Sequence, residues 1–305
     1  MQKFDLRRSA CLAGALVLTS SANIGQAQNK STPDHPTVTV QGQSYTPASI
    51  LARNMGSKED QEMQFPPHKI VGNVYYVGTK TLSSFLVVTP AGNILIDSTY
   101  ERNVQTIKKS VEQLGFKFSD TKMLLGNHAH GDHMEGDAMV KELTGAQVIV
   151  MDTDVEALKN LKPGGKEHPI DKIIHDGDTV ALGGYTLTAH WTPGHTRGAT
   201  TWTMKTTEDG KSYNVVFFAS LRSPAVVTPP MVDEFTRSFK LVATLPCDVP
   251  LGDHPAQFSM LEKYPKIKKG SPNPYIDAPG CKLEPAIEES MYHAILQEQE
   301  KATAK

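Results

Sequence analysis

A run of six residues constrains this chain more than any other feature of its sequence. Positions 128 to 133 read His-Ala-His-Gly-Asp-His, so three imidazoles and one carboxylate fall within a single short segment. These are ligands that suit zinc and need no thiolate beside them. In an extended backbone His128 and His130 project to the same side, so the spacing predicts that they share one metal ion. Asp132 and His133 follow Gly131, where the chain can turn, and are placed to reach a second ion.

Two further histidines occupy positions suited to completing such a site. His195 lies in the segment Thr-Pro-Gly-His-Thr, directly after a predicted strand that ends near His190. His254 lies in Leu-Gly-Asp-His-Pro, after a short apolar run at 249–251. Loops that follow strands are where functional side chains of layered α/β proteins gather. We therefore expect both histidines to join the 128–133 segment at one edge of the fold.

The pattern of apolar residues predicts a layered α/β domain over residues 68–305. Short apolar runs predict strands, and apolar residues at helical spacing predict amphipathic helices in both halves. The strands include Met123–Leu125, Gln147–Met151, Thr179–Leu182 and Val215–Ala219, and the helices are Arg102–Leu114, Met231–Leu245 and Glu284–Gln299. Such a mixture favours helices packed outside two sheets. Residues 28–67 are polar and predict an irregular N-terminal arm with one short helix near Ser49–Arg53.

The first 27 residues have the pattern of a signal peptide. A basic start (Lys3, Arg7 and Arg8) is followed by an apolar segment at 10–17 and a small-residue end, Gly-Gln-Ala at 25–27. The sequence thus predicts export to the periplasm or the medium, by the general or the twin-arginine route. A buried N-terminal helix is the structural alternative.

Export changes the expected state of the cysteines. Removal of residues 1–27 takes Cys11 away and leaves Cys247 and Cys281 in an oxidising compartment. Two thiols there favour a disulfide over a metal or redox site, with two free buried thiols as the alternative.

Charge and hydropathy exclude two classes of partner. The chain has 31 basic and 33 acidic side chains, a formal net charge of −2, and no cluster of Lys and Arg that would bind a phosphate backbone. No apolar run reaches the roughly 18–20 residues of a membrane span. We expect a soluble mature protein, without nucleic acid or membrane as partner, and a monomer.

Together the three histidine segments resemble the metallo-β-lactamase superfamily, over residues 66–298. This resemblance implies a four-layer αββα sandwich, the metallo-β-lactamase fold. In glyoxalase-type and many lactonase-type members an aspartate bridging both metals stands where this chain has Ser220, and two β-lactamase subclasses have a zinc-bound cysteine near it. A serine at position 220 therefore resembles the pattern of the third subclass, B3. The 245–249 stretch, together with the later Cys281, is also similar to that subclass and to its disulfide. By resemblance, two zinc ions are held, the first by His128, His130 and His195, and the second by Asp132, His133 and His254.

The function implied by this resemblance is hydrolysis of β-lactam antibiotics. A zinc-bound hydroxide would attack the amide carbonyl, with Asp132 as the catalytic residue that both ligates and orients the nucleophile. Ser220 and Arg222 would lie near the substrate carboxylate. Arg222 departs from the usual Ser or Thr, and its side chain could bind the carboxylate, crowd the site or turn to solvent. Asn127 is a second departure, since a Ser or Thr usually precedes the first histidine.

Asp97 matches a family aspartate that supports the metal loop by hydrogen bonds. The alternative is a residue that only ends a strand. For the histidines outside the site we expect surface positions at 35 and 68, a turn at 175, and structural roles at 190 and 293. His168 lies in a Pro- and Gly-rich loop near the presumed edge of the site, with a substrate contact as the minor alternative.

Charge counting also favours an anionic substrate. Two zinc ions, Asp132 and a hydroxide leave about +2, which suits a small molecule with a carboxylate. The alternative functions are hydrolysis of another ester, a lactone or a thioester within the same superfamily, and zinc binding without catalysis.

Overall fold

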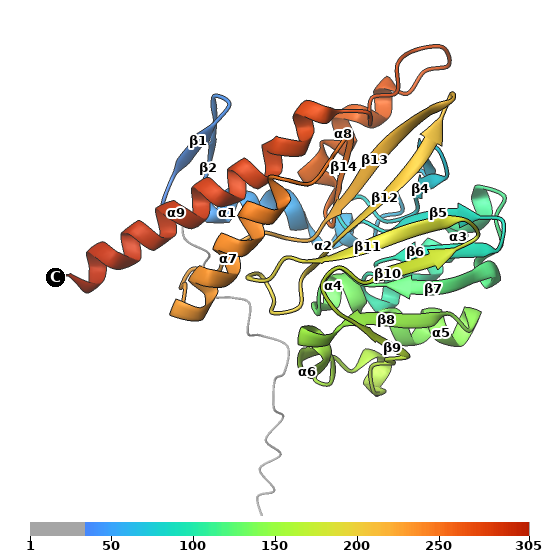
Figure 1. The fold of residues 1–305 in the computed structure, drawn as a ribbon, viewed down its shortest axis with the longest axis horizontal. Helices are drawn as coiled ribbons and strands as arrows, with labels where there is room; N and C mark the ends of the chain where they lie inside the picture. Colours follow the sequence, from blue (N-terminus) through green and yellow to red (C-terminus); the bar gives the residue numbers. More distant parts are fainter. Residues whose placement is uncertain (1–33, 305) are drawn as a thin grey trace, which may run out of the picture. The chain divides into compact units, whose positions relative to one another are not determined.

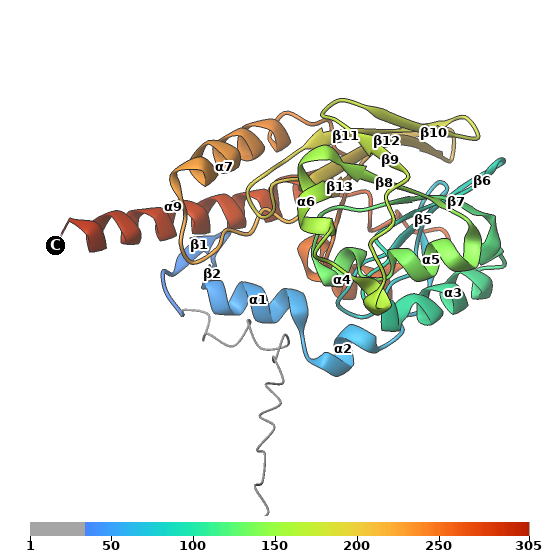
Figure 2. The same cartoon turned by 90° about the horizontal axis from the view of Figure 1, so that it is seen from below.

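Two β-sheets face each other at the centre of the fold, and helices cover their outer faces (Figures 1 and 2). The computed structural model describes residues 34–304, so the predicted signal peptide at 1–27 lies outside the described residues. The first sheet has the strand order β3-β4-β5-β6-β7-β8-β9, and its strands are β3 (His68–Val71), β4 (Val74–Tyr76), β5 (Phe85–Thr89), β6 (Gly92–Ile96), β7 (Thr121–Leu125), β8 (Gln147–Met151) and β9 (Lys172–Ile174). The second sheet has the order β10-β11-β12-β13-β14, with β10 (Thr179–Leu182), β11 (Tyr185–Trp191), β12 (Thr200–Glu208), β13 (Lys211–Phe218) and β14 (Val249–Gly252).

Strand direction decides where the histidine segments meet. Strands β3 to β6 run antiparallel, whereas β6 to β9 are parallel neighbours. The second sheet is antiparallel except for its last pair, β13 and β14. Parallel strands deliver their carboxyl ends to one edge, which is where loops of open α/β sheets form binding sites. The 128–133 segment follows β7, and His254 follows β14, so both lie after the carboxyl end of a parallel strand.

Nine α-helices occur among the described residues: α1 (Pro47–Met55), α2 (Lys58–Glu62), α3 (Val104–Gln113), α4 (Gly131–Met134), α5 (Asp137–Thr144), α6 (Val155–Leu158), α7 (Pro229–Val242), α8 (Met260–Lys263) and α9 (Leu283–Thr303). The apolar stripe of α3, with Ile107 and Val111, packs against the first sheet. No helix within residues 34–304 combines the length and the apolar character that a membrane crossing requires.

Three apolar clusters correspond to the three interfaces of four layers. The central cluster joins the two sheets through side chains such as Phe85 and Trp202. A second cluster lies between the first sheet and helices α3 and α5, and a third between the second sheet and helices α7 and α9. Figure 2 shows these helix pairs on opposite sides of the sheets. The predicted αββα sandwich is confirmed.

The predicted short helix near Ser49–Arg53 is confirmed by α1, but the irregular character predicted for the rest of the arm is wrong for the residues that the structure describes. Strands β1 (Val38–Val40) and β2 (Gln43–Tyr45) form a hairpin, and α1 and α2 follow it. The turn Gln41-Gly42 has positive φ at both residues (50° and 78°), as a two-residue hairpin turn with the correct twist requires. The side chain of Thr46 caps α1. The hairpin packs against α9, so this segment belongs to the sandwich.

The disulfide prediction is confirmed. Cys247 and Cys281 are bonded, 34 positions apart in sequence and with 6.1 Å between their Cα atoms. The bond ties the segment before β14 to the segment before α9. In the chain-entropy description, closing a loop of this size stabilises the fold by about 3–4 kcal/mol.

Candidate metal centre

The segment from 128 to 133 turns immediately after β7. The His130 amide donates to the His128 carbonyl at 2.8 Å, which is a three-residue turn, and α4 begins at Gly131. We expected an extended backbone to project His128 and His130 to the same side, and this reason for their proximity is wrong. The turn nevertheless brings the rings of His128 and His130 together, with centroids 4.8 Å apart.

A first triad of imidazoles forms when the loop after β11 delivers His195. The ring of His195 lies 4.7 Å from that of His128 and 4.8 Å from that of His130, centroid to centroid. One ring nitrogen of each lies within 4.8 Å of the others, a spacing that a single cation could fill. The loop that carries His195 passes close to α7 at Gly194, where φ is +131°. A residue with a Cβ would not fit there, because that atom would lie 2.8 Å from the Phe235 ring. His128 is buried, His195 half-buried and His130 exposed, so the triad opens to solvent on the side of His130.

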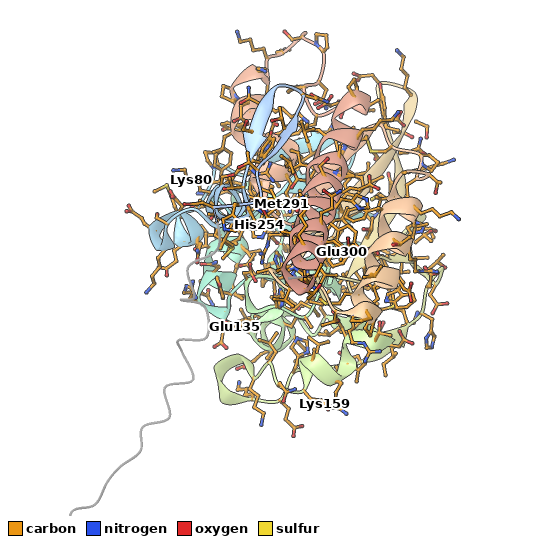
Figure 3. The ribbon with its side chains drawn as sticks, turned by 90° about the vertical axis from the view of Figure 1, so that its left-hand side faces the viewer. Lys80, Glu135, Lys159, His254, Met291 and Glu300 are labelled. Atoms are coloured by element: carbon orange, nitrogen blue, oxygen red, sulfur yellow. A yellow bond between two sulfur atoms is a disulfide. The ribbon has the colours of Figure 1, made fainter. Side chains whose placement is uncertain are left out.

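A second triad lies directly beside the first. Asp132 approaches His133 to 3.4 Å and His254 to 3.8 Å, measured from a carboxylate oxygen to Nε2. The rings of His128 and His133 are 4.2 Å apart and connect the two triads. His254 is buried, and it lies near the middle of the view in Figure 3, whereas Lys159 lies at its lower edge. The structure thus brings together all six residues nominated as metal ligands.

An acceptor lies behind most of the imidazoles. His195 Nδ1 is 2.8 Å from the Arg222 carbonyl, and His254 Nδ1 is 3.0 Å from the Thr81 carbonyl. His133 Nδ1 is 3.2 Å from an Asp97 oxygen. An acceptor at Nδ1 holds the proton there and leaves the lone pair on Nε2, which is the form that binds a metal. In the neutral form of these three rings, Nε2 is therefore the nitrogen available to a metal.

Burial sets the charge of most of the cluster. It lowers the pKa of His128, His195 and His254 and favours the neutral rings that a metal requires. His133 differs. Burial lowers its pKa, but the charge of Asp132 and the hydrogen bonds with Asp132 and Asp97 together outweigh burial and raise it.

Neither ring nitrogen of His128 has a hydrogen-bond partner among residues 34–304, although the side chain is buried. A buried donor or acceptor without a partner is costly, so a cation at this position would satisfy Nε2. Five imidazoles and one carboxylate are a donor set that fits zinc.

Asp97 holds the 128–133 segment from behind. It follows β6, is buried and has φ at +60°, an uncommon backbone conformation for a residue other than glycine. One carboxylate oxygen accepts the Asn127 amide at 2.8 Å, while the other faces His133. Burial raises the pKa of Asp97 to about 6, although the neighbouring His133 lowers it. Both ends of the carboxylate thus contact the segment.

Sequence reasoning missed Asp154, which holds the two loops of the first triad together. It follows β8 and is buried. One of its oxygens accepts the Ala129 amide at 2.8 Å and the Thr196 hydroxyl at 3.2 Å, and the other accepts the Gly198 amide at 2.8 Å. The sequence did contain a signal for Asp154, because this aspartate follows β8, an apolar strand that runs parallel to β7.

Asp253 was also missed, although it is the neighbour of His254 in sequence. It is fully buried, accepts the Ser220 amide at 2.8 Å and lies 3.4 Å from His128 Nδ1. Adding the carboxylates of Asp97 and Asp253 to the formal count brings the site from about +2 to about zero. Positive charge that would favour an anionic substrate must then come from a group outside this count.

The residues nominated for substrate contact lie after β13. Ser220 is buried, and its Oγ accepts the Arg222 amide at 3.4 Å. Arg222 is half-buried, so its side chain does not turn fully to solvent. Burial is the main cause that lowers the pKa of His130 and His195, and the charge of Arg222 adds to it. Arg222 thus supplies positive charge beside the first triad.

The other histidines lie outside the cluster. His68 is buried and its Nε2 is 2.7 Å from the Tyr275 hydroxyl, so the expected surface position is wrong. His168 is buried against Asp137 and the Met134 carbonyl, which makes it a support for α4 and not a substrate contact. His175 begins the predicted turn before β10.

Similar proteins share this architecture. Residues 78–205 match the family model of the metallo-beta-lactamase superfamily. The structure of the FEZ-1 metallo-beta-lactamase from Legionella gormanii is 42% identical, covers 78% of this chain and 98% of its own, and superposes with a TM-score of 0.75. BJP-1, a subclass B3 metallo-beta-lactamase of Bradyrhizobium japonicum, is 32% identical, with 80% and 98% covered and a TM-score of 0.74.

Curated relatives match over shorter segments. A hydroxyacylglutathione hydrolase of Hyphomonas neptunium is 39% identical over 71 residues, which are 23% of this chain and 24% of that protein. The chain thus spans about a quarter of the length of this relative, whereas it spans nearly all of the two solved structures.

Proposed function

This chain belongs to the metallo-β-lactamase superfamily, and from that membership we propose that it is a dizinc hydrolase that opens the amide bond of β-lactam antibiotics. The observation that carries the proposal is the convergence of the two triads from three separate loops, with the donor atoms of each triad within 4.8 Å of one another. The similarity to FEZ-1 and BJP-1 over most of the chain supports the choice of substrate.

Each of the two triads would hold one zinc ion. His128, His130 and His195 would hold one zinc ion, and Asp132, His133 and His254 the other. Zinc would supply Lewis-acid polarisation of the carbonyl and a water whose pKa is near 7. Asp132, a member of the second triad, would both ligate the metal and orient the nucleophile. The exposed side of His130 leaves a path by which the substrate reaches the cluster.

Recognition of the substrate would depend on Arg222 more than on the net charge of the metals. Because the buried carboxylates of Asp97 and Asp253 bring the formal charge of the centre to about zero, the guanidinium is the fixed positive group beside the first triad. A guanidinium can bind a carboxylate through two parallel hydrogen bonds. Ser220 is buried, so a substrate would contact this residue only through its Oγ atom.

Turnover of a chromogenic cephalosporin tests the proposal. We expect hydrolysis by the purified mature chain, loss of hydrolysis after chelation, and recovery after zinc is restored. Absence of hydrolysis with two equivalents of zinc bound would reject the β-lactam substrate. Hydrolysis that resists chelation would reject the metal mechanism.

The alternative functions are separated by the same preparation. A panel of a thioester, a lactone and an aryl ester tests the other hydrolases of the superfamily, whose local sequence matches include the hydroxyacylglutathione hydrolase. Zinc binding without turnover of any of these compounds would favour a zinc-binding protein without catalysis.

Export to the periplasm or the medium is part of the proposal. The Cys247–Cys281 disulfide supports it, because such bonds persist in oxidising compartments. Fractionation of cells that produce the full chain, with mass determination of the mature N-terminus, tests both the compartment and cleavage near residue 27. Sedimentation of the same material tests the proposed monomer.

A further inference from the structure

We propose that Asp253 is a positioning residue that holds the ring of His128 from behind and links it to the loop that carries Ser220. The inference rests on the proposed metal centre, but it concerns a residue outside the six ligands. It would make one short segment, Asp253-His254, contribute to both triads at once.

The geometry places one carboxylate oxygen between two donors. Asp253 Oδ2 accepts the Ser220 amide at 2.8 Å and lies 3.4 Å from His128 Nδ1. The second distance is somewhat longer than the 2.7–3.2 Å of an N–H···O hydrogen bond, so a small rotation of the ring would close it. The Asp253 carbonyl accepts the Ser83 amide at 3.0 Å, which fixes the backbone.

Burial explains why this carboxylate needs His128. Asp253 is fully buried, and its Oδ1 has no hydrogen-bond partner among residues 34–304. A buried carboxylate supported by a single amide is costly, and an Nδ1–H of His128 is the second donor in reach. A proton at Nδ1 leaves the Nε2 lone pair of His128 for the first metal. A carboxylate behind a metal-binding histidine fixes the ring and strengthens its bond to the metal.

The same carboxylate connects three loops of the site. Ser220 lies two residues before Arg222, whose carbonyl holds His195 Nδ1, so the loop anchored by Asp253 also carries the acceptor for a second ligand of the first triad. His254, the next residue after Asp253, belongs to the second triad. Occupation of the first site would therefore also hold the segment that presents His254.

The test compares two variants with a matched control. Asp253→Asn keeps the size and an acceptor for the Ser220 amide, whereas Asp253→Ala removes the acceptor. Asp248→Asn is the control, because Asp248 also accepts a backbone amide, that of Asn214 at 2.8 Å, but contacts none of the six ligands. We expect the zinc affinity of the first site, measured by competition with a chromophoric chelator, to fall about tenfold in Asp253→Asn and up to about 100-fold in Asp253→Ala. The control should match the wild type.

A second readout separates positioning from general structural damage. In the zinc-loaded wild type we expect a slowly exchanging ring N–H of His128 in ¹⁵N-edited NMR spectra. In Asp253→Ala this signal should be lost, while the corresponding signals of His133 and His254 persist. Should Asp253→Ala fail to fold, Asp253→Asn carries the test through affinity and a shifted His128 signal.

Three outcomes would overturn the inference. Wild-type affinity in folded Asp253 variants, with the His128 signal unchanged, would reject it while leaving the proposed hydrolase intact. Zinc bound directly to Asp253, seen in a crystal structure of the loaded protein, would replace positioning by ligation. A wild type that takes up no zinc would reject the proposed centre itself.

Discussion

Two groups of buried titratable side chains lie in this fold, and they differ in how their polar atoms are supported. In the metal centre, carboxylates and carbonyls from distant parts of the chain face the Nδ1 atoms of the histidines. On α9, Glu284 and Glu288 are both buried with fewer partners. Glu284 accepts a hydrogen bond from Arg53 of α1 at 2.6 Å, and Glu288 has no partner among residues 34–304.

The electrostatic consequences of the two arrangements are opposite. In the metal centre, the surrounding histidines outweigh burial and lower the pKa of Asp132, so that its carboxylate is ionised and available as a ligand. In the α9 pair, burial and the charge of Glu284 raise the pKa of Glu288 to about 8, although Arg53 and Arg222 act in the other direction. Supported groups are poised to bind a cation, whereas the unsupported acid is held protonated.

The comparison teaches that burial of titratable groups does not by itself mark a site. Convergence of donor atoms, with three of the five rings held by an acceptor at Nδ1, distinguishes the metal centre. Variants in each group should therefore fail in different ways.

The largest effect is expected for His195→Ala. It removes a proposed ligand of the first triad, and hydrolysis of a cephalosporin should fall by more than about 100-fold, beyond the range typical of residues that only support a ligand. His175→Ala, at an exposed turn outside both groups, is the control and should retain full activity. Near-normal turnover by His195→Ala would break the assignment of the first triad.

His254→Ala should lower the zinc content from about two equivalents toward one. The reason is that it leaves the second triad with two of its three ligands, whereas the first triad is intact. Elemental analysis of the dialysed protein measures the change. Unchanged stoichiometry would show that the loop after β14 is not part of the second site.

Asp154→Asn should weaken the first site selectively, by about tenfold in zinc affinity, within the range known for residues that support ligands. The amide can replace only one of the two acceptor oxygens that now hold the Ala129 and Gly198 amides. Asp152→Asn is the matched control on the same turn. Equal loss from both zinc sites would mean that Asp154 stabilises the whole fold and does not position the first triad.

The smallest effect, on stability alone, is expected for Glu288→Gln. Because the pKa of Glu288 is raised in the folded state, the folded protein binds more protons than the unfolded chain, and wild-type stability should fall as pH rises from about 4.5 to about 8. Glutamine mimics the protonated acid and removes this loss.

Thermal unfolding at pH 5 and pH 9 checks the prediction. We expect similar Tm values for wild type and Glu288→Gln at pH 5, and a clearly higher Tm for the variant at pH 9, where the wild-type acid must ionise in a buried position. Glu289→Gln, at the exposed neighbouring position, should follow the wild type at both pH values. A parallel pH dependence in all three proteins would place the titrating group elsewhere.

Much of the sandwich could be predicted from local patterns. The runs at 147–151 and 179–182 form strands with the predicted bounds, because continuous or alternating apolar residues leave few other conformations. The N-terminal segment was mispredicted because its hairpin depends on a two-residue turn and on an apolar surface of α9 more than 200 residues away. Polar composition alone did not indicate that this surface was present.

The amino-acid sequence by itself determined which donor atoms are available to a metal, since three histidine-bearing segments and a single pair of cysteines after residue 27 specify that chemistry locally. Only the tertiary structure decided what supports each donor. The Thr81 carbonyl lies 173 residues from His254 in sequence, Asp97 lies 36 residues from His133, and Asp154 reaches two loops from a third strand. Hydrogen bonds of this kind depend on distances of about 3 Å between groups that only the packing of two sheets brings together.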